Sequence, residues 1–450
     1  RLARAYALAA GLQLQARIAD EELVPGQTTT VELSLRDGSG ADAMAQRLFL
    51  TAGEADRWSF GPPSSAAKAE LSFTTPNDAA FTVPHGKHVF DAGFIASPIT
   101  AAADVTTHDS VTVRLELPLP LDVAPPVTLE FVDAPYLARI GVDQEVSFRF
   151  AVENHAPGPV TGSLGLSPSQ GLKLQAEPYL PFELAAEGDA KMMTVTPLFV
   201  DRLAPRDYYL AVHVDATQQI AMTKVRYVDL EVPANIRVGV VQSYDDTFVN
   251  TLEKMRVPHE ALAMADFAPA RLDTFTSIVI DIRAYLVRPD LVANNQALLE
   301  YVERGGTLLV MYQKTYEWKP EYAPYPIYVS HNRVTREDAP VELLAPDHPL
   351  FTGPNKVEAS DWNGWIQERG LYFPAEWDAA YTPLIATSDP GEDIPPGSYL
   401  IAQYGEGHYV YTALGWYRQL RELHPGALRM FANMLALGTE HAPAAQPSEE

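Results

Sequence analysis

Residues 276–313 read TSIVIDIRAYLVRPDLVANNQALLEYVERGGTLLVMYQ, and this stretch carries the clearest structural signal in the chain. Two short apolar runs, SIVIDI and TLLVMY, flank a segment that ends at a Gly-Gly stop. Within that segment apolar residues recur at helical spacing: Leu291, Leu298, Leu299 and Val302. Because continuous apolar strands occur in parallel sheets covered on both faces, the stretch predicts a strand, a helix and a parallel strand.

The same pattern extends on both sides of this stretch. Upstream, ANIRVGVVQ is a further apolar strand and TFVNTLEKMRV a further helix. Downstream, SYLIAQYGEGHYVYTALGWY reads as a tight hairpin, and PGALRMFANMLAL as a closing helix with one apolar stripe. We therefore predict a C-terminal α/β domain over residues 235–437, followed by a polar, disordered tail over residues 438–450.

The first half of the chain has the sequence pattern of antiparallel strands. Short stretches such as TTTVELSLRDGSG and SVTVRLELPLP alternate polar and apolar residues, as half-buried antiparallel strands do. A helical lead-in and a β-sandwich are expected over residues 1–121, and the linker-like DVAPP comes next. A second series of short strands with turn signals predicts an immunoglobulin-like sandwich over residues 125–232. The fold class is thus two β-sandwiches followed by an α/β domain.

Composition excludes several kinds of partner. The 450 residues contain 33 Lys and Arg against 58 Asp and Glu, a formal charge of -25, which repels nucleic acid and anionic lipid. No cysteine is present, so disulfides, thiolate metal sites and cysteine nucleophiles are absent. Since the apolar runs are far shorter than the roughly 20 residues that span a bilayer, no membrane insertion is expected.

Ligands of open parallel sheets bind beyond the carboxyl ends of the strands. After the first strand, Asp245 and Asp246 either hold a cation or a sugar hydroxyl, or the second of them caps the following helix. After the second strand, Arg283 lies close to Tyr285, and this arginine either grips a ligand carboxylate or pairs with neighbouring acids. After the third strand stands Gln313, with no Ser or Cys flanked by glycines, so no nucleophile elbow is available.

Residues 361–377, DWNGWIQERGLYFPAEW, concentrate aromatic side chains next to charged ones. Trp362 and Trp365 stabilise a small domain strongly if they are enclosed, and they stack on sugar rings if they are exposed. The sequence leaves both interpretations open. In the second one, Gln367, Glu368 and Arg369 lie beside an aromatic ligand platform.

Signals for catalysis and for metals are weak. The chain contains no G-x-S-x-G, H-E-x-x-H, P-loop or G-x-G-x-x-G motif. The closest histidine pair, His85 and His88, lacks carboxylate companions and is expected in a solvated loop. We therefore expect no catalytic residue, no metal site and no cofactor in this chain.

Several strings occur here in a familiar order, among them IRAYLVRPDLVANNQALLEYVERGGTLLVMY, DWNGWIQERGLYFPAEWD and YGEGHYVYTALGWYRQL. Over residues 235–437 the chain resembles the C-terminal region of large PIG-L (LmbE-like) family deacetylases. The resemblance implies a flavodoxin-type, glutamine-amidotransferase-like domain and a secreted or periplasmic location. In that family an upstream zinc domain with a His-Pro-Asp-Asp-type motif removes N-acetyl groups from amino sugars. This chain has no such motif, and the deacetylase domain is expected before Arg1.

The resulting hypothesis is a non-catalytic accessory region that binds a glycan or amino sugar, or positions substrate for the upstream deacetylase domain. One alternative is a purely structural or oligomerisation module, and another is an independent hydrolase. The tentative ligand-binding residues are Asp245, Asp246, Arg283, Tyr285, Gln313, Trp362, Trp365 and Arg369.

Overall fold

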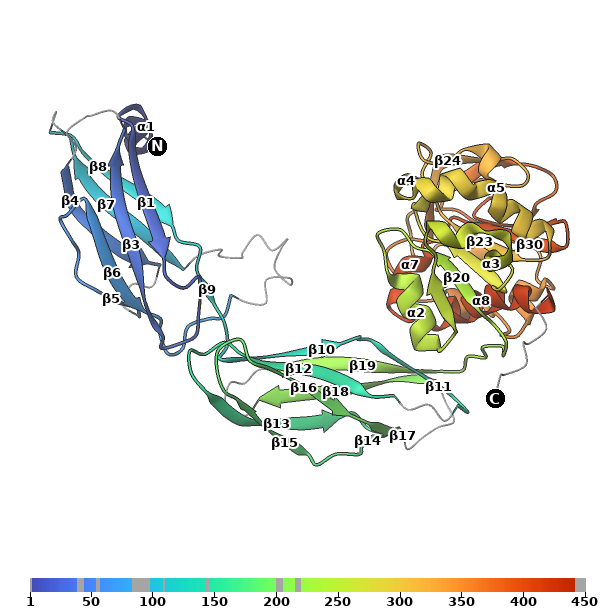
Figure 1. Ribbon diagram of the computed structural model, residues 1–450, viewed down its shortest axis with the longest axis horizontal. Coiled ribbons are helices and arrows are strands. Elements are labelled where there is room, and N and C mark those ends of the chain that lie inside the picture. Colours follow the sequence, from blue (N-terminus) through green and yellow to red (C-terminus); the bar gives the residue numbers. More distant parts are fainter. Residues whose placement is uncertain are drawn as a thin grey trace. The chain divides into compact units, whose positions relative to one another are not determined.

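A computed structural model describes most of the chain (Figure 1). The described residues are 2–38, 44–53, 57–82, 98–107, 110–142, 146–199, 205–214 and 220–441. They form two compact units, each with its own interior. The N-terminal unit is Arg1–Asp133, Ser147–Leu198 and Tyr209–Thr223, and the C-terminal unit is Ala134–Val146, Phe199–Tyr208 and Lys224–Glu450. The three-domain division at residues 121, 125, 232 and 235 stays a prediction.

The first part of the N-terminal unit begins with the predicted helical lead-in and continues as two antiparallel sheets. Buried residues of both sheets, such as Leu33, Leu48, Phe73 and Ala103, belong to one hydrophobic cluster, so the sheets form a sandwich. The helix is α1 (Leu2–Ala9). One sheet has the order β1 (Leu12–Ile18), β3 (Thr28–Asp37), β6 (Lys68–Thr74), β5 (Ser59–Phe60). The other is β4 (Met44–Ala52), β7 (Ile99–Thr106), β8 (Thr112–Pro118), and β2 (Glu22–Leu23) pairs with β9 (Asp122–Val123).

The second part of the N-terminal unit is also antiparallel. Alternate residues of its strands are buried, as in β12, where Phe148, Phe150 and Val152 point inward. One sheet orders β10 (Val127–Val132), β12 (Phe148–Asn154), β16 (Ala190–Val195). In another, β13 (Val160–Pro168) lies between β15 (Tyr179–Leu184) and the Leu210–Val214 part of β18 (Arg206–Val214). The short strands β14 (Leu172–Leu174) and β17 (Pro197–Phe199) pair with each other.

The C-terminal unit contains a seven-stranded sheet. Its order is β21 (His259–Ala261), β20 (Val238–Val241), β22 (Ser277–Ile280), β23 (Thr307–Met311), β30 (Gly407–Thr412), β29 (Tyr399–Tyr404), β27 (Thr382–Pro383). The strands from β21 to β30 are parallel, which confirms the pairing predicted for the apolar runs. The predicted hairpin is β29 and β30, which are antiparallel. Outside this sheet, β11 (Tyr136–Arg139) pairs in parallel with the Val225–Val228 end of β19 (Ile220–Val228).

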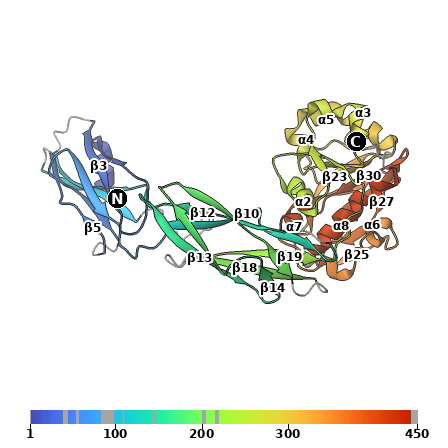
Figure 2. The ribbon, with the colours of Figure 1, turned by 60° about the horizontal axis from the view of Figure 1, so that its bottom comes forward.

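Helices cover both faces of this sheet (Figures 1 and 2). One group is α3 (Pro269–Leu272), α4 (Ala284–Val287) and α5 (Pro289–Glu303); the other is α2 (Thr247–Met255), α7 (Trp416–Arg421) and α8 (Pro425–Ala436). The predicted stripe of α5 is buried, because its apolar residues pack against β23 and β30. No described helix is both long enough and apolar enough to cross a bilayer.

Smaller elements complete this unit. They are η2 (Met264–Phe267), η3 (Pro320–Tyr322), β24 (Ile327–Val334), β25 (Val341–Leu343), α6 (Pro349–Thr352), η4 (Ala359–Trp362), β26 (Gly370–Trp377), β28 (Ile385–Thr387) and η5 (Leu437–His441). Residues 438–441, predicted as the start of a disordered tail, instead belong to η5, where Thr439 Oγ1 donates to the carbonyl of Ala436. Residues 442–450 and the pair His85 and His88 lie outside the described residues.

Candidate functional site

Of the two adjacent aspartates after β20, Asp245 is the one whose carboxylate makes contacts that stabilise the fold. Asp245 Oδ1 accepts the backbone N–H of Thr247 at 2.8 Å, and Asp245 Oδ2 pairs with Arg421 at 2.7 Å. Asp246 is exposed at the N-cap position of α2, and its side chain forms no capping hydrogen bond. The interpretation that Asp246 caps the helix is therefore wrong, and the Asp245 carboxylate bonds the first turn of α2 instead.

Arg283 follows β22 and is paired, as one of the two interpretations predicted. Its guanidinium donates to the Glu317 carboxylate at 3.3 Å, to the Tyr316 hydroxyl at 2.6 Å and to the Tyr244 hydroxyl at 3.3 Å. Its backbone is left-handed, with φ of 56°. Tyr285, by contrast, is buried in the core and donates its hydroxyl to Asn295 Oδ1 at 2.6 Å, so the prediction of a ligand contact at Tyr285 is wrong.

Gln313 is fully buried just after β23. Its amide nitrogen donates to the carbonyl oxygens of Asp281 at 3.0 Å and Met311 at 2.9 Å, and its amide oxygen accepts from the backbone of Tyr285 at 3.3 Å. The side chain ties the end of β22 to the end of β23. It is a structural residue, because none of its polar atoms remains available for a ligand.

The tryptophan cluster belongs to the core. Trp362 and Trp365 are 4% and 2% exposed and stack with ring centroids 5.3 Å apart. The Arg369 guanidinium lies over Trp365 and donates to the carbonyl oxygens of Ala339 and Trp362 at 2.7 and 2.6 Å. Burial lowers the pKa of Arg369 to about 10. The interpretation of Trp362 and Trp365 as core residues is confirmed, and the prediction that they form an exposed ligand platform is wrong.

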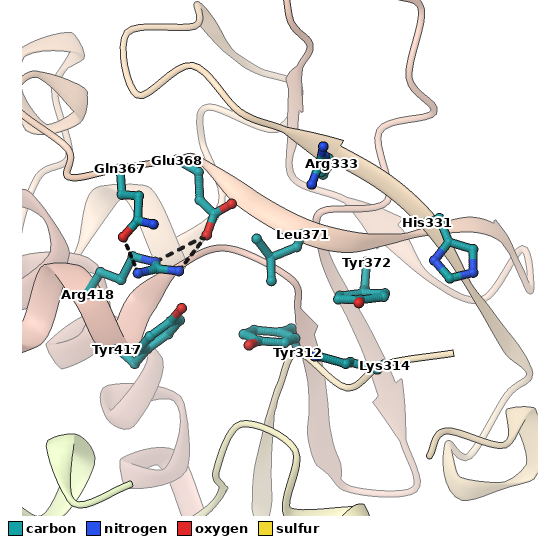
Figure 3. A pocket seen from close by; sticks show the side chains of 10 residues that line it. All are labelled: Tyr312, Lys314, His331, Arg333, Gln367, Glu368, Leu371, Tyr372, Tyr417 and Arg418. Carbon is teal, nitrogen blue, oxygen red and sulfur yellow. Dashed lines mark hydrogen bonds and ion pairs between the residues drawn. The ribbon is translucent and has the colours of Figure 1, made fainter. Parts of the chain in front are cut away.

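An open pocket of about 590 Å³ lies next to that cluster, above the carboxyl end of β23 (Figure 3). Tyr312 and Lys314 come directly from the end of β23, whereas the other lining residues come from β24, β26, the turn before β26 and the start of α7. The lining residues are Tyr312, Lys314, His331, Arg333, Gln367, Glu368, Leu371, Tyr372, Tyr417 and Arg418.

Irregular pairing of β24 with β26 aims two side chains into this pocket. The register steps from Val329↔Pro374 to Asn332↔Phe373, which leaves His331 without a partner across the strands. It steps again before Arg333↔Leu371, which leaves Tyr372 unpaired. Such bulges re-aim side chains near binding sites. Tyr372 and Gln367 also have left-handed backbones, with φ of 58° and 71°, a conformation that costs free energy in any residue with a Cβ.

Three tyrosines form the aromatic part of the pocket (Figure 3): Tyr372 and Tyr417 are partly exposed, whereas Tyr312 is 4% exposed and packs behind them. Tyr312 and Tyr372 lie nearly parallel, with centroids 6.1 Å apart, and Tyr417 lies 6.1 Å from Tyr312 at 50°. Burial raises the pKa of Tyr312 and of Tyr417. Both hydroxyls are therefore neutral hydrogen-bonding groups at physiological pH.

Charged side chains surround these rings. Arg418 pairs with Glu368 at 3.0 Å and donates to Gln367, so one positive and one negative charge are matched. Lys314 Nζ lies 5.6 Å from the centroid of the Tyr372 ring. Among the described residues, neither Lys314 nor Arg333 forms an ion pair, and Arg333 is exposed. The pocket thus combines aromatic faces, amide and hydroxyl groups, and two uncompensated cations.

Asp281, at the end of β22, is a buried acid that the sequence analysis did not single out. It is 1% exposed and accepts from the Ser243 backbone at 3.0 Å and the Ser243 hydroxyl at 2.6 Å. Burial raises its pKa to about 6. The available signal in the sequence was a single acid inside the apolar run SIVIDI. The lining residues of β24 gave no comparable signal, because only the two bulges bring them to the pocket.

Within the part of the chain that the structure describes, no three His, Asp or Glu residues gather closely enough to hold a metal ion. No protein-family model matches the sequence, and no curated protein matches it either.

Several solved structures are distantly similar. The native conformation of E. coli alpha-2-macroglobulin matches 48% of this chain and 17% of its own, at 13% identity and a TM-score of 0.22. The Yersinia pseudotuberculosis adhesin InvE matches 50% of this chain and 62% of its own, at 12% identity and a TM-score of 0.18. The fibronectin(III)-like modules of Clostridium thermocellum CbhA match 48% and 93%, at 9% identity and a TM-score of 0.17. Likeness at this level supports no statement about function.

Proposed function

We propose that this chain is a non-catalytic, glycan-binding accessory region of a PIG-L-like deacetylase, and that the ligand binds in the Tyr312–Tyr372–Tyr417 pocket. The observation that supports the proposal is the lining of that pocket. Tyrosine faces stack on the apolar faces of sugar rings, and planar amide, carboxylate and guanidinium groups bond sugar hydroxyls in pairs. Gln367, Glu368 and Arg418 supply all three kinds of planar group in contact with one another.

The finer fold assignments are part of this proposal. The parallel strands β20, β22 and β23 with helices on both faces support a flavodoxin-type, glutamine-amidotransferase-like domain. The alternating antiparallel strands of residues 125–232 support an immunoglobulin-like sandwich. A deacetylase domain outside this chain, and a secreted or periplasmic location, follow from the resemblance to the PIG-L family.

Calorimetric titration of the whole chain with chitotetraose and with a uronic acid tetrasaccharide tests the proposal. We expect a dissociation constant below about 1 mM for at least one of them, and a Tyr372→Ala variant that binds three- to tenfold more weakly because a stacking face is lost. Tyr316→Ala is the matched control, because Tyr316 is 67% exposed and does not line the pocket. Absence of heat with every saccharide would reject glycan binding.

A purely structural role is the second candidate, and the burial of Trp362 and Trp365 favours it. It predicts that pocket variants leave every binding measurement unchanged while core variants reduce solubility. The titration above therefore separates the two functions.

A further inference from the structure

The charge of the pocket is opposite to that of the chain. The whole protein carries a formal charge of -25, yet the ten lining residues contain three basic side chains and one acidic side chain. The acid, Glu368, is already bonded to Arg418. Two positive charges, those of Lys314 and Arg333, are left without an anionic partner among the described residues.

Both free cations are held where a ligand would meet them. Lys314 lies over the face of Tyr372, and this cation–π contact keeps its ammonium at the aromatic part of the pocket. Arg333 is fixed to the strand pair by its register with Leu371, directly beside the bulge that presents Tyr372. In Figure 3 the two side chains stand on opposite sides of Tyr372 and Leu371, with Arg418 at a third side. Unpaired cations around an aromatic face fit an anion attached to a ring.

We propose that the pocket selects acidic saccharides: one sugar ring stacks on Tyr372, a carboxylate or sulfate of the saccharide bonds Arg333, and Lys314, on the other side of Tyr372, meets a further anionic group. This inference rests on the proposed glycan binding and adds its selectivity. A free amino sugar, which is cationic, is disfavoured by the same two charges. The affinity for a neutral N-acetylated saccharide should lie between those for the acidic and the cationic saccharides.

Four tetrasaccharides of similar size distinguish the charge classes when each is titrated into the full chain. They are a hyaluronan tetrasaccharide with carboxylates only, an O-sulfated chitotetraose with sulfates only, neutral chitotetraose, and cationic chitosan tetraose. We expect at least one acidic ligand to bind about tenfold more tightly than chitotetraose, and chitosan tetraose to bind most weakly, because a hydrogen bond to a charged group is stronger than one between neutral groups. The preference should fall as salt is added.

Two variants test the residue assignment at equal net charge. Arg333→Gln should abolish most of the preference for the acidic ligand, whereas Arg336→Gln should leave it unchanged, because Arg336 is exposed and paired with Asp338 at 2.7 Å. Equal affinities for neutral and acidic tetrasaccharides would overturn the selectivity and leave glycan binding intact. Equal losses in the two variants would also overturn it, since only the long-range field of the protein would then act. Failure of all four ligands would reject both proposals.

Discussion

Two aromatic clusters of the C-terminal unit contain the same kinds of side chain and have opposite properties. In one, Arg369 lies against Trp362 and Trp365, and its guanidinium donates to backbone carbonyls inside the core. In the other, Arg333 lines an open pocket with Tyr372, and it has no ion-pair partner among the described residues. Aromatic and arginine content alone therefore does not distinguish an enclosed core cluster from an open pocket; burial does.

The largest effect is expected from the closed cluster. Trp365→Ala should lower the free energy of unfolding by about 3 to 5 kcal/mol, because a buried aromatic leaves a cavity that the core cannot fill. Urea unfolding followed by circular dichroism at 222 nm reports it, since α2 to α8 lie in the C-terminal unit. Tyr328→Ala, at 51% exposure, should cost less than about 1 kcal/mol. Similar losses in both variants would show that the tryptophan is not enclosed.

The buried acid beneath the strand ends gives a pH dependence. Burial raises the pKa of Asp281 from 3.8 to about 6, so between these pH values the folded state holds a proton that the unfolded chain has lost. The free energy of unfolding therefore falls as the pH rises through this window. Relative to Asp281→Asn, the parent protein should lose about 2 kcal/mol of unfolding free energy between pH 4 and pH 7.

Urea unfolding at pH 4, 5, 6 and 7 measures this difference. Asp273→Asn is the control, because that carboxylate is 47% exposed and pairs with Arg304 at the surface. If the parent and Asp281→Asn proteins show parallel stability curves over this range, the pKa of Asp281 is not raised.

The two arginines can be compared directly. Arg369→Gln should destabilise the protein by about 2 kcal/mol, because buried carbonyls of Ala339 and Trp362 lose their donors. Arg333→Gln should change the free energy of unfolding by less than about 0.5 kcal/mol, since no described group depends on its guanidinium. Thermal unfolding of both variants measures the two losses of stability. Equal losses would contradict the distinction between the enclosed and the open cluster.

The smallest effect concerns backbone strain. Gln367 is exposed with φ of 71°, so Gln367→Gly should raise stability by about 0.5 to 1 kcal/mol. The same change removes the hydrogen bond to Arg418 and should weaken glycan binding two- to threefold. Gln367→Ala lacks the amide and keeps the strain, so it should weaken binding without the gain in stability. A gain of equal size in the alanine variant would rule out the strain.

Much of the fold could be predicted from local patterns. The apolar runs SIVIDI and TLLVMY correctly predicted β22 and β23, and the spacing of the leucines correctly predicted α5. Such patterns are readable because side chains on the buried face recur with the period of the helix or strand. The hairpin of β29 and β30 followed from its glycine turn. Pattern reasoning assigned the helix cap to Asp246 and missed Asp245, since cap geometry depends on backbone angles that the pair Asp-Asp does not specify.

The sequence predicted where in the fold a candidate site lies, but not which side chains line it. The loops after β20, β22 and β23 lie at the edge of the sheet where the pocket is, but Gln313 and Tyr285 point into the core there. Tyr312 and Lys314, immediate neighbours of Gln313, line the pocket instead. Neighbouring side chains at the end of a strand point in opposite directions. Knowing which loop lines the pocket therefore does not tell which of its side chains point into the pocket and which into the core.

The sequence by itself determined the types of the elements, the parallel order of the central strands, the absence of cysteine chemistry and the strongly acidic charge. Only the tertiary structure decided that Trp362 and Trp365 are enclosed while Tyr372 and Arg333 remain accessible. The physical reason is that periodicity is a local property of the chain. Burial at these positions depends instead on how β24, β26 and α7, distant in sequence, pack around one another.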